Sequence, residues 1–99
     1  MLTKTQHRFL KAQANQLKAL YQLGKNDLGP THIELFDKAL LARELIKVSV
    51  LRSVLTPVKE VAEQVALATK ADLIETKGRT FVLFRRNLKE PKIKLPLWK

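Results

Sequence analysis

The sequence predicts a mixed α and β domain, with the element order α-β-α-β-α-β-β and three helices packed on a four-stranded mixed sheet. Two observations predict this fold class. Segments with apolar residues at helical spacing alternate with short runs in which every second residue is apolar. The last two of these runs are separated by a glycine-containing pair, as in a β-hairpin. Because 99 residues suffice for one modest core, we expect a single domain over residues 1–99, with its core over about 3–86 and a basic C-terminal tail over 87–99.

The first helix is predicted over residues 3–18. Leu10, Ala14 and Leu17 recur at the spacing of one helical face, and basic residues occupy the other faces. A short strand over residues 19–23 is expected to follow. One side of this helix should therefore pack on the sheet while a basic side faces solvent.

The second helix is predicted to begin at the end of a turn cluster over residues 24–30. Gly29 and Pro30 fit an N-cap followed by the first helical position, where the missing N–H of proline costs nothing. Thr31 and Glu34 offer a competing capping box. Under either interpretation a helix starts here.

This second helix is expected to run to about Glu44, and a strand with one buried face follows over residues 46–50. Thr56 is predicted to cap the third helix, with Pro57 at its first position and an end near Lys70. Strands separated by helices favour parallel neighbours joined by right-handed crossovers, so we expect this arrangement for the first three strands.

The final hairpin is predicted from Leu73 onward, with a turn at Lys77 and Gly78 and a fourth strand over residues 80–86. The side chains of this strand are apolar on both faces, and such strands are usually buried on both. The segment also overlaps the RNP octapeptide of RNA-recognition motifs, but Arg79 stands where that octapeptide has an aromatic residue. We therefore interpret the phenylalanines of this strand as core residues rather than as base-stacking residues.

Positive charge is concentrated near both ends of the chain. Residues 1–27 contain five basic residues and one acidic residue, residues 28–76 contain six and seven, and residues 77–99 contain eight and one, for a total net charge of +10. If folding brings the two ends together beside Gly24, they form one positive surface suited to nucleic acid. The alternative is a dispersed charge that serves solubility.

The connection after Gly24 is a second candidate for nucleic-acid binding. A predicted strand ends at Gly24, a tight turn follows, and a helix begins shortly afterwards. Backbone N–H groups in such a turn, together with the positive N-terminus of the helix, can hold a phosphate. KH domains clamp single-stranded nucleic acid with a GxxG loop of this kind.

Three stretches carry a resemblance to a known family: LKAQANQLKALYQLGKND (10–27), ELIKVSV (44–50) and KGRTFVLFRR (77–86). They resemble the CRM domain, named for chloroplast RNA splicing and ribosome maturation, and in particular its bacterial stand-alone YhbY-like members. The resemblance implies a fold related to the C-terminal domain of translation initiation factor three. It also implies an RNA-binding protein that associates with precursors of the large ribosomal subunit through a GxxG loop and the neighbouring basic surface.

Carried over to this chain, the resemblance makes Gly24 the first glycine of the loop and Lys25 and Asn26 its variable pair. Asp27 stands where the family has its second glycine. Aspartate tolerates a left-handed backbone better than most residues, so the turn can form, but its carboxylate would repel a phosphate. Either Asp27 points away from the RNA, or the contacts shift toward Lys25 and the start of the next helix.

The predicted RNA-binding residues combine this loop with basic side chains from both ends of the chain, including three arginines that we expect to be free to meet a ligand. These residues are Lys4, Arg8, Lys11, Lys18, Gly24, Lys25, Asn26, Asp27, Arg79, Arg85 and Arg86.

Catalysis is not expected. The chain has no cysteine and two histidines, and its carboxylates form no suggestive pair, so we expect no enzyme activity, metal, cofactor or small-molecule substrate. No apolar run approaches the roughly 20 residues of a membrane helix, and we expect a cytoplasmic monomer without a membrane partner. His7, His32, Asp37 and Glu44 are interpreted as solvent-facing polar residues.

Two other functions stay open from the residues alone. A DNA-binding regulator would place a basic helix in the major groove, although the interleaved strands leave no helix-turn-helix. A structural protein of the mature ribosome would carry the same positive charge and is distinguished by sedimentation with mature rather than precursor subunits.

Overall fold

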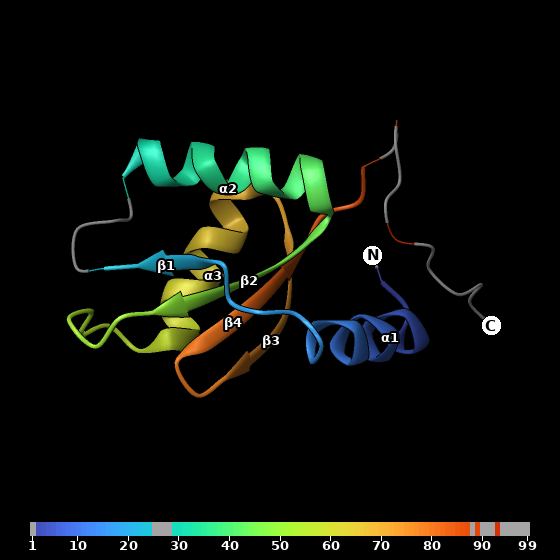
Figure 1. Ribbon diagram of the computed structural model, residues 1–99, viewed down its shortest axis with the longest axis horizontal. Helices are drawn as coiled ribbons and strands as arrows, with labels where there is room; N and C mark the ends of the chain where they lie inside the picture. The colour runs from blue at the N-terminus through green and yellow to red at the C-terminus, as the bar shows by residue number, and fades with distance from the viewer. Residues whose placement is uncertain (1, 25–28, 88, 90–92, 94–99) are drawn as a thin grey trace.

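The computed structural model describes residues 2–24, 29–87, 89 and 93. Its elements follow the predicted order and lie around one sheet (Figure 1). They are α1 (Lys4–Ala14), β1 (Tyr21–Leu23), α2 (Pro30–Arg43), β2 (Leu45–Val50), α3 (Val58–Thr69), β3 (Asp72–Lys77) and β4 (Thr80–Phe84). The predicted fold class, with three helices packed on a four-stranded mixed sheet, is confirmed.

The sheet has the strand order β1-β2-β4-β3. β1 and β2 are parallel, with Tyr21 opposite Val48 and Leu23 opposite Val50, as predicted for strands joined by a crossover helix. β2 and β3 are not neighbours, because β4 lies between them and pairs antiparallel with both. The prediction of parallel neighbours is therefore wrong for β3. The hairpin folds back so that its second strand, which is apolar on both faces, takes a central position.

The sheet separates two hydrophobic cores. α2 and α3 cover one face and enclose the larger core, to which β4 contributes Phe81 and Leu83. α1 packs on the other face over a smaller core that includes Val82 and Phe84. Phe81 is 0% exposed and Phe84 is 1% exposed. The interpretation of these phenylalanines as core residues, on a strand buried on both faces, is confirmed.

α1 is shorter than predicted. Thr3 caps it in a reciprocal capping box, in which the Gln6 N–H donates to Thr3 Oγ1 and the Thr3 N–H donates to Gln6 Oε1, both at 3.1 Å. The helix ends at Ala14 rather than at residue 18. Leu17, which was predicted to continue the apolar stripe, lies in the connection to β1 and is 36% exposed.

The starts of the other two helices are close to the prediction. α2 begins as predicted, with Gly29 as its N-cap and Pro30 as its first residue. α3 begins at Val58, with Pro57 rather than Thr56 in the N-cap position. The one-residue difference places the fixed φ of proline just outside α3 instead of at its first position.

The final hairpin turns one residue later than predicted. Lys77 pairs with Thr80, so the two residues between the strands are Gly78 and Arg79. Gly78 has a φ of +58°, which glycine adopts without steric cost. β4 ends at Phe84, two residues before the predicted end.

Candidate nucleic-acid interface

The predicted basic residues of the N-terminal segment lie on the exposed side of α1. Leu10 and Ala14 are buried against the sheet, while Lys4, Arg8 and Lys11 are exposed. These three residues follow the i, i+4, i+7 spacing of one helical face. Lys4 and Lys11 are seven residues apart, which corresponds to about 10 Å along the helix axis. α1 thus presents a row of three cations on a firmly docked helix.

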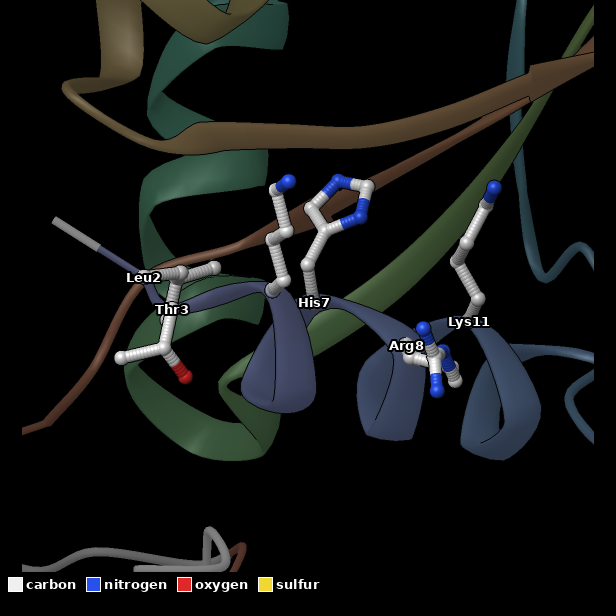
Figure 2. Close-up of a pocket in the computed structure, with 6 residues that line it drawn as sticks. Leu2, Thr3, His7, Arg8 and Lys11 are labelled. Carbon is white, nitrogen blue, oxygen red and sulfur yellow. The ribbon is translucent and has the colours of Figure 1, made fainter. Parts of the chain in front are cut away.

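An open pocket of about 410 Å³ lies against this row of cations. Figure 2 shows His7 and Lys11 extending from the same side of the helix. The pocket is lined by Leu2, Thr3, Lys4, His7, Arg8 and Lys11. Because three of these side chains are cationic, one is a histidine and none is acidic, the pocket is suited to an anion. We call it the α1 pocket.

Charge differs between the two helical layers of the molecule. α1 contains no acidic residue, whereas α2 and α3 together contain more acidic than basic residues. The charged residues of α2 and α3 are Lys38, Arg43, Lys59, Glu34, Asp37, Glu60 and Glu63. Two acidic residues of the strand β3, Asp72 and Glu75, pair with Phe84 and Val82, which lie in the core on the α1 side of the sheet. α1 itself carries three basic residues and no acidic residue, so it is the most strongly positive element of the described fold.

Gly24 lies far from α1. It follows Leu23, which pairs with Val50 at the end of β2, whereas α1 packs with Leu45 at the start of β2. Five residue steps along β2 separate these positions, or about 16 Å. Figure 1 shows the end of β1 and the start of α2 at one end of the long axis and α1 toward the other.

The predicted phosphate loop is only partly described. Lys25, Asn26 and Asp27 lie outside the described residues. Its flanks are described: Gly24 is half-buried after β1, and Gly29 caps α2 in an extended conformation. The contact of this loop with phosphate stays a prediction.

Arg79 is engaged within the protein rather than free. Its Nε donates to the Val50 carbonyl at 3.1 Å, and its Nη2 donates to the Leu51 carbonyl at 2.5 Å and to the Val54 carbonyl at 3.3 Å. These carbonyls belong to the end of β2 and to its connection with α3. The guanidinium group thus holds this connection in place, so it is not free as expected. Arg79 is nevertheless exposed, and its contact with RNA stays a prediction.

Arg85 is also engaged within the protein. Its Nη1 donates to Asp37 Oδ1 at 2.6 Å and to the Thr69 carbonyl at 2.7 Å, and its Nη2 donates to the Asp37 carbonyl at 3.0 Å. These bonds join the end of β4 to α2 and to the end of α3. The expectation that Arg85 is free is therefore wrong. Asp37 is ion-paired, although its side chain is still 44% exposed to solvent.

Those predicted RNA-binding residues that the structure describes therefore fall into two groups. The basic residues of α1 lie at the end of the sheet where β4 finishes, and the exposed Arg86 follows Phe84 at that end. Gly24 and Arg79 lie at the opposite end, and the exposed Lys18 lies on the connection that leads from α1 to β1. Folding brings the basic residues of α1 and Arg86 to the same end of the sheet, but the prediction that these cations lie beside Gly24 is wrong.

Glu44 was missed as a structural residue. It is 0% exposed at the end of α2 and has a φ of 63°. Its Oε2 accepts the Asn87 N–H and its Oε1 accepts the Ile93 N–H, both at 2.6 Å, while its carbonyl accepts the Arg85 N–H at 2.9 Å. A positive φ at a non-glycine residue costs on the order of 1–3 kcal/mol and persists where surrounding contacts fix it. Glu44 thus ties the segment after β4 to the junction of α2 and β2.

Other kinds of site find no support in the part of the chain that the structure describes. No three His, Asp or Glu side chains gather there as a metal site. None of the described helices has the length and apolar character required to cross a membrane. His32 is half-buried, with its ring centroid 6.5 Å from that of Phe36, so it is not the exposed polar residue that was predicted.

These features define a small α+β domain with one strongly basic helix and, among its described residues, no metal cluster. Residues 2–85 match the CRS1 / YhbY (CRM) domain, and the chain belongs to this family. The resemblance predicted from the sequence is thereby confirmed.

Similar proteins cover nearly the whole chain. The probable RNA-binding protein YqeI of Bacillus subtilis is 38% identical over 96 residues, which is 97% of this chain and 100% of that protein. A Haemophilus influenzae protein named as an RNA-binding protein is 34% identical, over 96% of this chain and 95% of that protein. The solution structure of the hypothetical protein SAV1595 from Staphylococcus aureus, for which RNA binding has been suggested, has a TM-score of 0.79 and 35% identity, covering 97% of this chain and 100% of that one.

Proposed function

We propose that this protein binds RNA, chiefly through the sugar–phosphate backbone, with the α1 side of the sheet facing the RNA. Support comes from its membership of the CRM family and from similar proteins that are named as RNA-binding. The observation that carries the proposal is the uneven distribution of charge. α1 has three cations and no acidic residue, whereas α2 and α3 together are net acidic.

Contact with the backbone rather than with the bases is favoured by the placement of the aromatic rings. Phe81 and Phe84 are buried in the two cores, and none of the aromatic residues that the structure describes is exposed. Base stacking requires an accessible ring. Binding should therefore be electrostatic and only weakly selective for sequence.

The test is the salt dependence of the affinity for single-stranded RNA, measured by fluorescence anisotropy. Each phosphate neutralised on a single strand should contribute about −0.7 to the slope of log K against log salt concentration. Duplex DNA of equal length is the comparison. Affinity independent of salt would contradict the proposal, and tighter binding to duplex DNA would favour a DNA-binding regulator.

We also propose that the RNA is ribosomal and that the protein assists assembly of the large subunit in the cytoplasm, as a monomer. The support is the family resemblance, and the positive charge is compatible with it. Sedimentation of cell extracts tests this function. An assembly factor should migrate with precursors of the large subunit, whereas migration with mature ribosomes would identify a structural ribosomal protein.

A further inference from the structure

We propose that the α1 pocket is a separate binding site for RNA phosphates, able to hold the backbone of a single strand without help from the Gly24 end of the sheet. This inference rests on the proposed RNA-binding function and specifies where one contact with the backbone is made. Its ligand is the phosphodiester backbone, and it needs no particular base.

The composition of the pocket favours this ligand. Lys4, Arg8 and Lys11 line it along one helical face, and its volume of about 410 Å³ leaves room for a phosphate and its neighbouring sugar. Lys4 and Lys11 are about 10 Å apart along the helix axis, so they can meet different phosphates of one strand. His7 lies between them and is half-buried, and its imidazole N–H can donate to a phosphate or sugar oxygen.

The backbone that carries these side chains is fixed before any ligand arrives. The capping box of Thr3 and Gln6 closes the first turn of α1. Leu10 is 0% exposed and Ala14 is 1% exposed, so the helix is docked on the sheet through the smaller core. A ligand that binds here orders only side-chain tips, which lowers the entropic cost of binding.

The pocket is independent of the other candidate region. All its lining residues lie within residues 2–11 of the chain. Gly24 lies beyond the opposite end of β2, about 16 Å along the strand from the position where α1 packs. An RNA long enough to reach both regions should therefore bind more tightly than a short one, because the second contact becomes intramolecular.

The experiment compares two double variants that remove the same charge. Lys4→Gln/Lys11→Gln alters the α1 pocket, while Lys38→Gln/Lys59→Gln removes two exposed lysines from α2 and α3 as the matched control. Glutamine and lysine have similar helix propensities, so both proteins should fold like the parent, and thermal unfolding checks this. Loss of two single-strand phosphate contacts should weaken binding about 25-fold at 0.1 M salt and make the salt slope shallower by about 1.4. The control should change affinity by less than about threefold, since distant exposed charges are screened.

The outcomes separate the pocket from the proposed function. If the unaltered protein does not bind a single-stranded oligouridine, both ideas are overturned. If it binds, and the pocket variant keeps its affinity or loses no more than the control, RNA binding stands and the pocket is overturned.

A direct measurement locates the contact. Titration of the labelled protein with a six-nucleotide oligouridine should shift the NMR amide signals of residues 4–11 more than those of α2 and α3. His7→Ala should weaken binding about 2- to 10-fold, as expected for the loss of one hydrogen bond. Shifts confined to elements other than α1 would overturn the proposal.

Discussion

Replacement of Phe81 with alanine tests whether β4 is a core strand or a platform for base stacking. The side chain is 0% exposed and belongs to the larger core. A buried phenylalanine removes about 150–250 Å² from water, which corresponds to about 4–6 kcal/mol at 25 cal/mol per Å². Alanine keeps part of this contribution and leaves a cavity. We therefore expect Phe81→Ala to lower the free energy of unfolding by about 3–5 kcal/mol.

Urea unfolding followed by circular dichroism measures this loss. A lower midpoint with an unchanged slope indicates a change in stability rather than in the denatured state. The control is Leu67→Ala on α3, because Leu67 is 83% exposed and its truncation should change stability by less than about 0.5 kcal/mol. A domain with about 5–15 kcal/mol of total stability can be partly unfolded by the Phe81→Ala change.

Phe81→Leu keeps the test decisive if the alanine variant does not fold. Leucine retains most of the apolar volume but has no aromatic face, so the protein should stay folded and bind RNA like the parent. RNA affinity is measured by fluorescence anisotropy on the same sample. If either variant unfolds like the parent but no longer binds RNA, the ring contacts RNA and the interpretation of β4 as a core strand is refuted.

Three further substitutions test individual residues. Glu44→Gln turns one of two buried acceptor oxygens into a donor and should lower the free energy of unfolding by about 1–3 kcal/mol, measured in urea. If this variant were as stable as the control Glu34→Gln, at an exposed position, the role of Glu44 in holding the segment after β4 would be contradicted. Lys25→Glu should weaken RNA binding at an unchanged unfolding midpoint, and unaltered affinity would remove the loop from the site. Asp27→Gly should leave affinity equal or higher, since a carboxylate that repels phosphate is removed. A clear loss would assign Asp27 a role in the turn.

Local patterns were sufficient to predict most of the elements. Gly29 and Pro30 marked the start of α2 correctly because an N-cap and a first-turn proline act within one turn. The continuous apolar run from Phe81 to Phe84 identified β4 as buried on both faces. The end of α1 was placed too late because Leu17 fits the helical spacing, although the chain has already left the helix to reach β1.

The sheet order and the roles of the charged residues depend on distant partners. Arg85 meets Asp37, which is 48 residues away, and Arg79 meets carbonyls 25–29 residues away. Glu44 is buried by bonds to residues 43 and 49 positions further along the chain. No local pattern distinguishes such arginines from those that face solvent. The candidate site could therefore be predicted as a set of basic residues, but not as two separate groups.

The central position of β4 has a consequence for biosynthesis. β4 is the last of the strands that the structure describes, yet it pairs with both β2 and β3 and supplies side chains to both cores. During synthesis, one edge of β2 and the pairing edge of β3 stay without a partner strand until residues 80–84 have emerged from the ribosome. Unpaired strand edges favour aggregation. We therefore expect the sheet to fold in one late step, after nearly the entire domain has been synthesised, rather than strand by strand during translation.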